Sequence, residues 1–193
     1  MRISPVAPNL GNKMFNIDSF TNGQIDSKLW LCRELESLGW SSKLTHLYGG
    51  WYAIIAFLLL TREKFQVDRI ESYDLDPECQ PIADMINANY VFKEWKFKAY
   101  THDCNTLIHS DPDLIINTST EHFETMHWFD NIKPGTRVIL QGNNMDHDDH
   151  VVETNSIEEF IEQYPLTDIA YSGSLYFKYP EWDFTRFMII GTK

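Results

Sequence analysis

The chain has 193 residues, of which 43% are hydrophobic and 14% aromatic, so it is long and apolar enough to fold around a core of its own. Its formal net charge is -12 and no basic run occurs. This argues against a nucleic-acid partner, because binding phosphates requires clustered Lys and Arg. A small molecule or a local site on a protein remains open as the partner.

The cysteines and the apolar runs indicate the compartment. Cys32, Cys79 and Cys104 are too few and too scattered for a disulfide framework or a zinc site, which predicts buried thiols in a reducing cytosol. The N-terminus lacks the apolar run of a signal peptide, and the most apolar stretch, Trp51–Leu60, is about half the length that spans a bilayer. We therefore expect a cytoplasmic protein without a membrane partner.

The chain begins with an arm and one helix. Residues 1–24 are rich in Pro, Asn, Gly and Ser without a period, which predicts an irregular arm. Asp26 then offers a helix N-cap, leucines share one helical face, and Gly39 ends the helix. No linker or repeat follows, so we predict a single domain over residues 1–193. It consists of the arm and helix (1–42) and an α/β core (43–193).

Strand-like and helical segments alternate from residue 43 onward. The predicted strands are Leu44–Tyr48, Arg69–Asp74, Lys96–Tyr100, Leu114–Asn117, Arg137–Gln141, Asp168–Tyr171 and Thr185–Gly191. The predicted helices of the core are Tyr52–Leu60, Pro77–Asn89, Glu121–Ile132 and Ile157–Tyr164. Such alternation favours a parallel sheet covered by helices on both faces.

The last two strands break this alternation. Only a loop that starts at Gly173 joins them, and no crossover helix fits there, so they should be antiparallel neighbours. The predicted fold is therefore a three-layer α/β sandwich. Its seven-stranded sheet is mostly parallel with an antiparallel last strand, and a helical arm precedes it.

A glycine turn after the first strand is the first candidate for a binding site. Gly49 and Gly50 separate the strand from the next helix, and paired glycines allow positive φ and close approach of a ligand. The N-terminus of the following helix points at this turn, which in an open α/β sheet is where nucleotide-like ligands bind.

Acidic residues follow the next two strands. Asp74 ends the second strand about 25 residues after Gly49, a position from which a carboxylate accepts both hydroxyls of a ribose. Asp76 is better explained as the cap of the next helix. Asp103 follows the third strand at the same sheet edge, where it can accept from an exocyclic amino group such as that of adenine. The fourth strand then leads through Asn117 into Glu121-His122.

Through the order of these features, from the glycine turn to the strand-end acids and Glu121-His122, the chain resembles a class I S-adenosylmethionine-dependent methyltransferase. The resemblance covers residues 40 to 193 and includes the Lys133-Pro134-Gly135 turn before the fifth strand. It implies S-adenosylmethionine as the cofactor and methyl transfer to a small-molecule acceptor. It assigns the following residues to the cofactor site: Gly49, Gly50, Trp51, Tyr52, Asp74, Leu75, Asp103, Cys104, Asn117 and Thr118.

The glycine loop departs from the family pattern. The family has a carboxylate two positions before its first glycine, where this chain has Leu47, and its second and third glycines are Trp51 and Ala53 here. Trp51 is expected to stack on the methionine tail or to wall it off. The fourth strand also lacks the Asn/Asp-Pro-Pro-aromatic signature of nucleic-acid amino methyltransferases, which agrees with the acidic charge.

Candidate catalytic and substrate residues come from two later segments. His122, beside Glu121, is a candidate base because imidazole titrates near neutral pH, and a purely structural role stays open. Asn143, Asn144 and His147 are candidate substrate contacts in the loop after the fifth strand. The two histidines and three aspartates of this loop offer metal-ligand chemistry, but a solvated or substrate-contacting loop is favoured, so no metal site is predicted.

Two alternative functions remain at this stage. A nicotinamide-dependent oxidoreductase on a similar sheet would need the fuller GxGxxG spacing, which the Gly49 turn lacks. A non-catalytic module that binds S-adenosylmethionine stays possible because of the altered loop. The oligomeric state does not follow from the sequence.

Overall fold

The computed structural model describes residues 15–107 and 111–193. Most of the predicted irregular arm, residues 1–14, lies outside the described residues. Within them, a short 3₁₀ helix, η1 (Ile17–Phe20), leads into the first α-helix.

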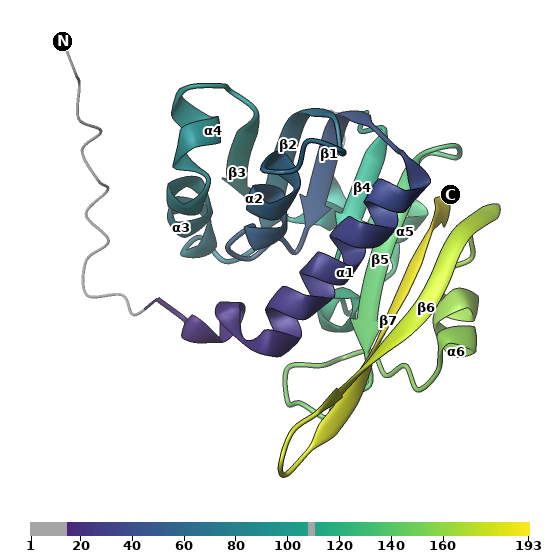
Figure 1. Cartoon of the computed structure of the whole chain (residues 1–193). Helices are drawn as coiled ribbons and strands as arrows, with labels where there is room; N and C mark the ends of the chain where they lie inside the picture. The colour runs from purple at the N-terminus through teal and green to yellow at the C-terminus, as the bar shows by residue number, and fades with distance from the viewer. Residues whose placement is uncertain (1–14, 108–110) are drawn as a thin grey trace.

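One sheet organises the molecule (Figure 1). Its strands are β1 (Ser42–Tyr48), β2 (Val67–Asp74), β3 (Phe97–Thr101), β4 (Leu114–Asn117), β5 (Arg137–Asn143), β6 (Asp168–Lys178) and β7 (Asp183–Thr192). Their spatial order is β3-β2-β1-β4-β5-β7-β6. Strands β1 to β5 pair in parallel, whereas β7 runs antiparallel to both β5 and β6. The predicted seven-stranded sheet with an antiparallel last strand is confirmed.

Helices cover both faces of the sheet. They are α1 (Asn22–Leu38), α2 (Ile54–Leu60), α3 (Cys79–Ile86), α4 (Ala88–Phe92), α5 (His127–Asp130) and α6 (Ile157–Gln163), with 3₁₀ turns η2 (Cys104–Thr106) and η3 (Thr120–His122). Helices α1 to α4 contribute to one apolar cluster with the sheet, and α5 and α6 to another.

Alternation along the strands divides the core between these two clusters. On β1, Leu47 belongs to the α1 side and Tyr48 to the α5 side. On β4, Ile115 faces the α5 side while Ile116 faces the other. Successive strand residues point to opposite faces, so a nearly continuous apolar run is what a strand buried on both faces requires. This confirms the predicted three-layer sandwich.

The first helix starts earlier than predicted. It begins at Asn22 rather than after Asp26, although it ends as predicted at Gly39, whose φ is +64°. The Thr21 side chain makes no capping bond, and instead the N–H of Gly23 donates to the hydroxyl of Tyr179 at 3.1 Å. A partner on the distant β6–β7 hairpin therefore satisfies a first-turn donor that a local cap would otherwise take.

The predicted helix over Glu121–Ile132 is wrong. The segment forms η3 and then the single turn α5, with Phe123 extended between them. The Glu121 carbonyl accepts the N–H groups of Val151 and Val152 at 2.9 and 3.2 Å. These long-range bonds take the acceptor that a continuous helix would use for its own next turn.

Three other boundaries also differ. The helix predicted over Pro77–Asn89 is split into α3 and α4, and α2 begins at Ile54 because Ala53 has a left-handed backbone (φ +50°). The loop predicted from Gly173 is mostly strand, since β6 continues to Lys178 and pairs with β7 along its length. The apolar and aromatic residues of this hairpin thus extend the sheet.

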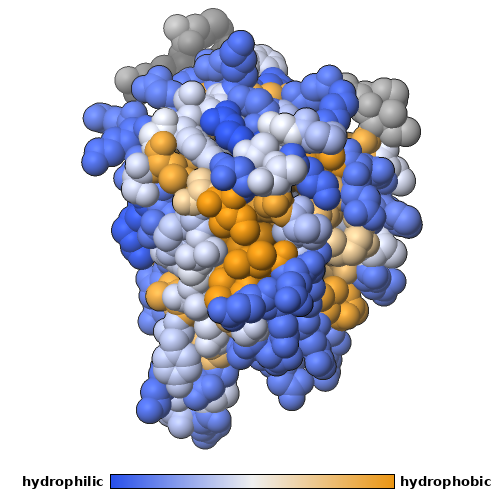
Figure 2. Space-filling model, turned by 90° about the vertical axis from the view of Figure 1, so that its right-hand side faces the viewer, coloured by the Kyte–Doolittle hydropathy of each residue, from blue (hydrophilic) through white to orange (hydrophobic). Residues whose placement is uncertain are grey.

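Strand β6 forms one edge of the sheet and is mostly exposed or half-buried. On the side of the molecule that carries this edge, hydrophobic residues gather in a central strip with hydrophilic residues around it (Figure 2). Among residues 15–107 and 111–193, no helix has the length and apolar character needed to cross a bilayer.

Candidate active site

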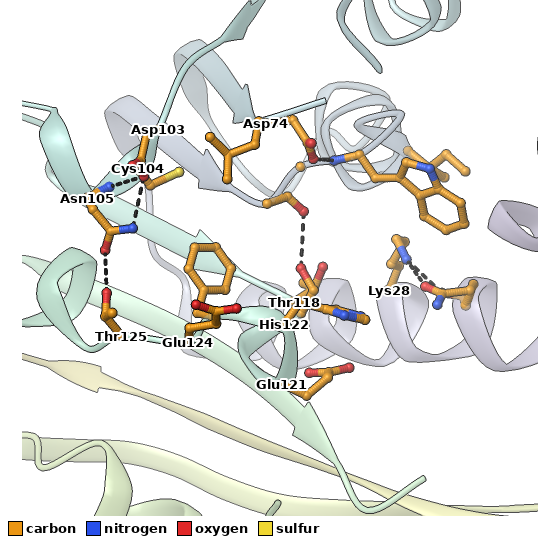
Figure 3. Close-up of a pocket in the computed structure, with 18 residues that line it drawn as sticks. Lys28, Asp74, Asp103, Cys104, Asn105, Thr118, Glu121, His122, Glu124 and Thr125 are labelled. Atoms are coloured by element: carbon orange, nitrogen blue, oxygen red, sulfur yellow. Dashed lines mark hydrogen bonds between the residues drawn. The ribbon is translucent and has the colours of Figure 1, made fainter. Parts of the chain in front are cut away.

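The carboxyl ends of the parallel strands surround one cavity of about 600 Å³. The strand order reverses between β1 and β4, and ligands of open α/β sheets bind at such a point. A cavity of this size is typical of small-molecule sites. Its lining comprises Gln24, Lys28, Gly49, Gly50, Trp51, Ile54, Asp74, Leu75, Asp103, Cys104, Asn105, Thr118, Ser119, Glu121, His122, Phe123, Glu124 and Thr125. Figure 3 shows these side chains arriving from separate elements around the opening.

The glycine turn forms the floor of the cavity beside β1. Gly49 has φ +59°, and a Cβ there would lie 2.9 Å from Ser119 Oγ, whose hydroxyl donates to the Gly49 carbonyl. A Cβ on Gly50 would lie 2.0 Å from Ser72 Oγ. Trp51 and Ala53 also have positive φ, at +48° and +50°. The loop therefore places left-handed residues at every second position, including two where the family pattern has glycine.

Asp74 at the end of β2 is held by the glycine loop. Its Oδ2 accepts the N–H of Trp51 at 2.7 Å and its Oδ1 accepts the N–H of Asp76 at 3.0 Å. Burial raises the pKa of Asp74, and the two backbone N–H groups offset part of that rise. Each carboxylate oxygen keeps a further lone-pair direction for a ligand hydroxyl. Asp76 in turn accepts from the N–H of Glu78, which is itself the N-cap residue of α3, so Asp76 caps the turn before α3 and not the helix itself as predicted.

Asp103 is held in a similar way at the end of β3. Its Oδ1 accepts both the backbone N–H and the side-chain amide of Asn105, each at 2.9 Å. The Asn105 side-chain oxygen accepts from Thr125 Oγ1 and from the Trp128 N–H, which ties this strand end to the α5 segment (Figure 3). Burial raises the pKa of the Cys104 thiol to about 12, so Cys104 contributes an apolar wall rather than a nucleophile.

Glu121 and His122 on η3 stand between this cavity and a second one. The second cavity, about 640 Å³, also contains Asn143, His147 and His150 in its lining. Glu121 is 4% exposed, and its Oε1 contacts the Asn143 amide and lies 3.7 Å from Arg186 Nη1. The buried Glu121 carboxylate is thus compensated by the Asn143 amide and the Arg186 guanidinium.

Lys28 on α1 also lines the first cavity. It is 8% exposed, and its ammonium donates to Gln24 Oε1 at 2.6 Å. Burial, and to a smaller extent the nearby Arg186, lower the pKa of Lys28 to about 7, against an opposing effect of Glu121. A lysine of this kind exists partly as the free amine at neutral pH, which makes it able to accept a proton.

Comparison with solved structures identifies the fold. The N-methyltransferase NodS from Bradyrhizobium japonicum WM9 is 12% identical, with a TM-score of 0.65 over 91% of this chain and 99% of that one. Magnesium protoporphyrin IX methyltransferase (ChlM) from Synechocystis PCC 6803 with bound SAM is 12% identical, with a TM-score of 0.64 over 95% of this chain and 88% of that one. The chain has the class I methyltransferase fold. No family model and no curated protein matches its sequence.

Other methyltransferases share this fold at similar distance. A putative RNA methyltransferase from Pyrococcus horikoshii is 14% identical, with a TM-score of 0.62 over 87% of this chain and 84% of that one. NodS has also been solved in complex with S-adenosylhomocysteine, and that structure gives a TM-score of 0.66 at 12% identity, over 94% of this chain and 93% of that one. At these identities the likeness concerns the methyltransferase fold alone.

Within this methyltransferase fold, most of the predicted cofactor residues line the first cavity, and Tyr52 and Asn117 do not. Tyr52 is buried, its ring stacks on Phe15, and its hydroxyl accepts the Asn16 N–H. Asn117 is fully buried and its side-chain oxygen accepts the Ser119 N–H, so it supports the turn that follows β4.

The predicted catalytic and substrate residues divide between the two cavities. Glu121 and His122 line both, whereas Asn143 and His147 line the second one. Asn144 is bound to β7 instead, because its side-chain oxygen accepts the Thr185 N–H at 2.6 Å.

Lys28 and Asn105 are among the lining residues that reasoning from the sequence missed. Lys28 lies on a helix whose pattern resembles an ordinary amphipathic one, and only the packing of α1 over the strand ends buries it. Asn105 follows Asp103 by two residues, the spacing of an Asx turn, and that local signal was available in the sequence.

Proposed function

We propose that this chain transfers a methyl group from S-adenosylmethionine to a small-molecule acceptor. The observation that carries the proposal is the convergence of the Gly49-Gly50 turn with Asp74 and Asp103 on one cavity at the point where the strand order reverses. ChlM with bound SAM has the same fold, and the carboxylate acceptors that this cavity offers suit the hydroxyls and the amino group of a nucleoside.

The residues fit the parts of the cofactor in a definite order. Asp74 would accept from the ribose hydroxyls, with Leu75 against the adenine ring and Asp103 accepting from its amino group. Gly49, Gly50 and Trp51 would lie beside the ribose and methionine portions, and Thr118 near the methyl group. The cofactor, when bound, supplies a methyl group on a sulfonium whose C–S electron pair returns to sulfur as the acceptor attacks.

This chain's own residues would position the acceptor and receive its proton. Holding the acceptor atom in line with the methyl carbon supplies most of the rate. Lys28 and His122 both line the cavity and are the candidate bases, since each can present a nitrogen lone pair. Replacing the base should lower kcat and leave cofactor affinity unchanged. The pH profiles of kcat in Lys28→Met and His122→Asn therefore distinguish the two residues, because only the variant that lacks the base loses the pH dependence that the base produces.

The acceptor class is inferred from charge. A net charge of -12 disfavours a polyanion, and both cavities have the volume of small-molecule sites. Because the fold also occurs in a putative RNA methyltransferase, bulk tRNA belongs in the acceptor screen beside small amines, phenols and carboxylates. Methylation of tRNA in that screen would contradict the small-molecule assignment while leaving the methyl donor in place.

Calorimetric titration with S-adenosylmethionine, S-adenosylhomocysteine and NAD tests the cofactor assignment. Losing the hydrogen bonds to a charged carboxylate costs about 1.5–3 kcal/mol, so Asp74→Asn should weaken binding of both sulfur ligands by about 10- to 150-fold. Asp76→Asn is the matched control, because this carboxylate accepts the Glu78 N–H in the turn before α3 and does not line the cavity.

Each outcome of the titration has a definite meaning. Tighter binding of NAD than of S-adenosylhomocysteine would overturn the proposal in favour of an oxidoreductase. Binding of the sulfur ligands without turnover on any acceptor would favour a non-catalytic binding module.

A further inference from the structure

The structure gathers three metal-ligating side chains from two separate loops. Glu121 and His122 come from η3 after β4, and His150 comes from the loop after β5. One ligand atom of each lies within 4.8 Å of the other two. Hydrogen bonds from Val151 and Val152 to the Glu121 carbonyl fix the two loops against each other. The loop pattern alone predicts no metal site, because the sequence does not reveal this contact.

Each imidazole is oriented by a hydrogen bond from Nδ1, and its Nε2 has no hydrogen bond to any residue within 15–107 and 111–193. His122 Nδ1 donates to the Asp149 carbonyl at 3.0 Å, and His150 Nδ1 donates to the Met145 carbonyl at 2.7 Å. Because a carbonyl can only accept, the proton is on Nδ1 in each ring and the lone pair is on Nε2. Backbone carbonyls that orient histidine ligands in this way are the usual outer contacts of metal sites.

The carboxylate supplies an independent sign of a missing partner. Glu121 is 4% exposed, and its Oε2 has no hydrogen-bond partner among the described residues, although Oε1 is matched by Asn143 and Arg186. A buried carboxylate oxygen without a partner is costly. A cation beside it would remove that cost.

We propose that Glu121, His122 and His150 bind one divalent transition-metal ion at the border of the two cavities. Two imidazoles and one carboxylate suit Zn²⁺ and its neighbours in the first row rather than Mg²⁺ or Ca²⁺, which prefer all-oxygen ligands. At Zn²⁺ bond lengths, tetrahedral ligand atoms lie roughly 3.4 Å apart, so the three ligand atoms, which now lie within 4.8 Å of one another, must approach by up to about 1.4 Å.

The neighbouring His147 provides the matched control. Its Nδ1 accepts the Asp149 N–H at 3.2 Å, so the proton of its neutral ring is on Nε2 and the ring is not set to bind the ion. His147 also lies in the same loop, 5.5 Å from the His150 ring by centroids, and it is exposed. Removing it changes the charge and histidine content of the loop as much as removing His150 does.

Three protein ligands leave coordination positions open. His150 lines the second cavity, and Glu121 and His122 line both. If the chain transfers methyl groups as proposed, a hydroxyl or carboxylate oxygen of the acceptor would occupy an open coordination position of the ion. Only this contact with the acceptor rests on the proposed function. Metal binding by His122 uses the lone pair that a base needs, so Lys28 would then receive the proton.

Calorimetry on the tag-free, chelator-treated full chain tests the site with Zn²⁺, and visible absorption tests it with Co²⁺, both without S-adenosylmethionine. We expect one Zn²⁺ per chain. His122→Ala and His150→Ala should each weaken its affinity by about 100-fold or more, beyond the 10–100-fold typical of outer contacts. His147→Ala should retain affinity within about threefold, the scatter expected for a residue that does not coordinate the ion.

The two histidine variants remove partly exposed side chains, and their melting curves without metal verify that they fold. Equal binding in all three variants, or loss in His147→Ala alone, would overturn the proposal, as would the absence of binding by the wild type. Because no cofactor or acceptor is present, failure here leaves the methyl-transfer proposal intact, and failure of S-adenosylhomocysteine binding leaves the metal site intact.

Discussion

Lys28 gives a prediction whose size follows from its burial. The amine has a pKa of 10.5 in the unfolded chain and about 7 in the folded protein, where burial is the main cause. Between these values the unfolded chain binds a proton that the folded protein does not, so stability rises with pH. At ~1.36 kcal/mol per pKa unit, the free energy of unfolding changes by about 5 kcal/mol in total. The protein has this stability in full above pH 10.5 and loses it as pH falls to about 7.

Lys28→Met removes this dependence while keeping most of the side-chain volume. The variant should be more stable than the wild type at about pH 7, and its advantage should shrink by about 2 kcal/mol by about pH 9. Urea unfolding followed by tryptophan fluorescence at several pH values measures the difference. Lys43→Met on β1 is the control. Because that lysine is exposed, the stability difference between this variant and the wild type should be the same at each pH. A constant difference for Lys28→Met as well would refute the argument from burial.

Three further changes test other parts of the fold. Gly50→Ala should lower the melting temperature, because the new Cβ would lie 2.0 Å from Ser72 Oγ and this buried hydroxyl must rotate away; unchanged melting would contradict this packing. Trp51→Gly should raise the free energy of unfolding by about 1 kcal/mol, since a left-handed backbone costs roughly that for a residue with a Cβ; lower stability would show that the indole packs more than it strains. Asp113→Asn should lower stability at neutral pH and flatten its loss on acidification. Burial raises the pKa of Asp113, but hydrogen bonds from Ser42 and from two strand N–H groups lower it by more, so the pKa is lower in the folded protein than in the unfolded chain. The stabilisation by Asp113 is therefore present above the unfolded pKa and lost as pH falls through the folded pKa. Urea titrations at neutral and at acidic pH measure this loss.

Local patterns predicted those parts of the fold that local contacts determine. The sheet strands follow from apolar runs, the end of α1 from Gly39, and the start of α6 from Ser156, whose hydroxyl accepts the Glu159 N–H. The start of α1 and the break before α5 were not predictable, because Tyr179 and Val151, far along the chain, supply the deciding hydrogen bonds.

The candidate site divides in the same way. Asp74 and Asp103 were found because parallel strands bring their carboxyl ends to one edge, so strand order alone places them together. Lys28 and His150 were not assigned, because the burial of one and the neighbours of the other depend on packing between distant segments. Functional residues could be recognised from their type only where the strand order already placed them at the binding edge of the sheet.

The left-handed residues of the glycine loop also bear on how such proteins diverge. Gly49, Trp51 and Ala53 follow a backbone path that glycine would adopt at less cost, yet two of the three carry side chains. The path is therefore separable from the residue that usually marks it. The indole of Trp51 adds apolar surface to the cavity lining, which a glycine at this position would not. Selection can thus reshape what the loop contacts while the main chain beneath it stays the same, and the recognisable signature disappears before the architecture does.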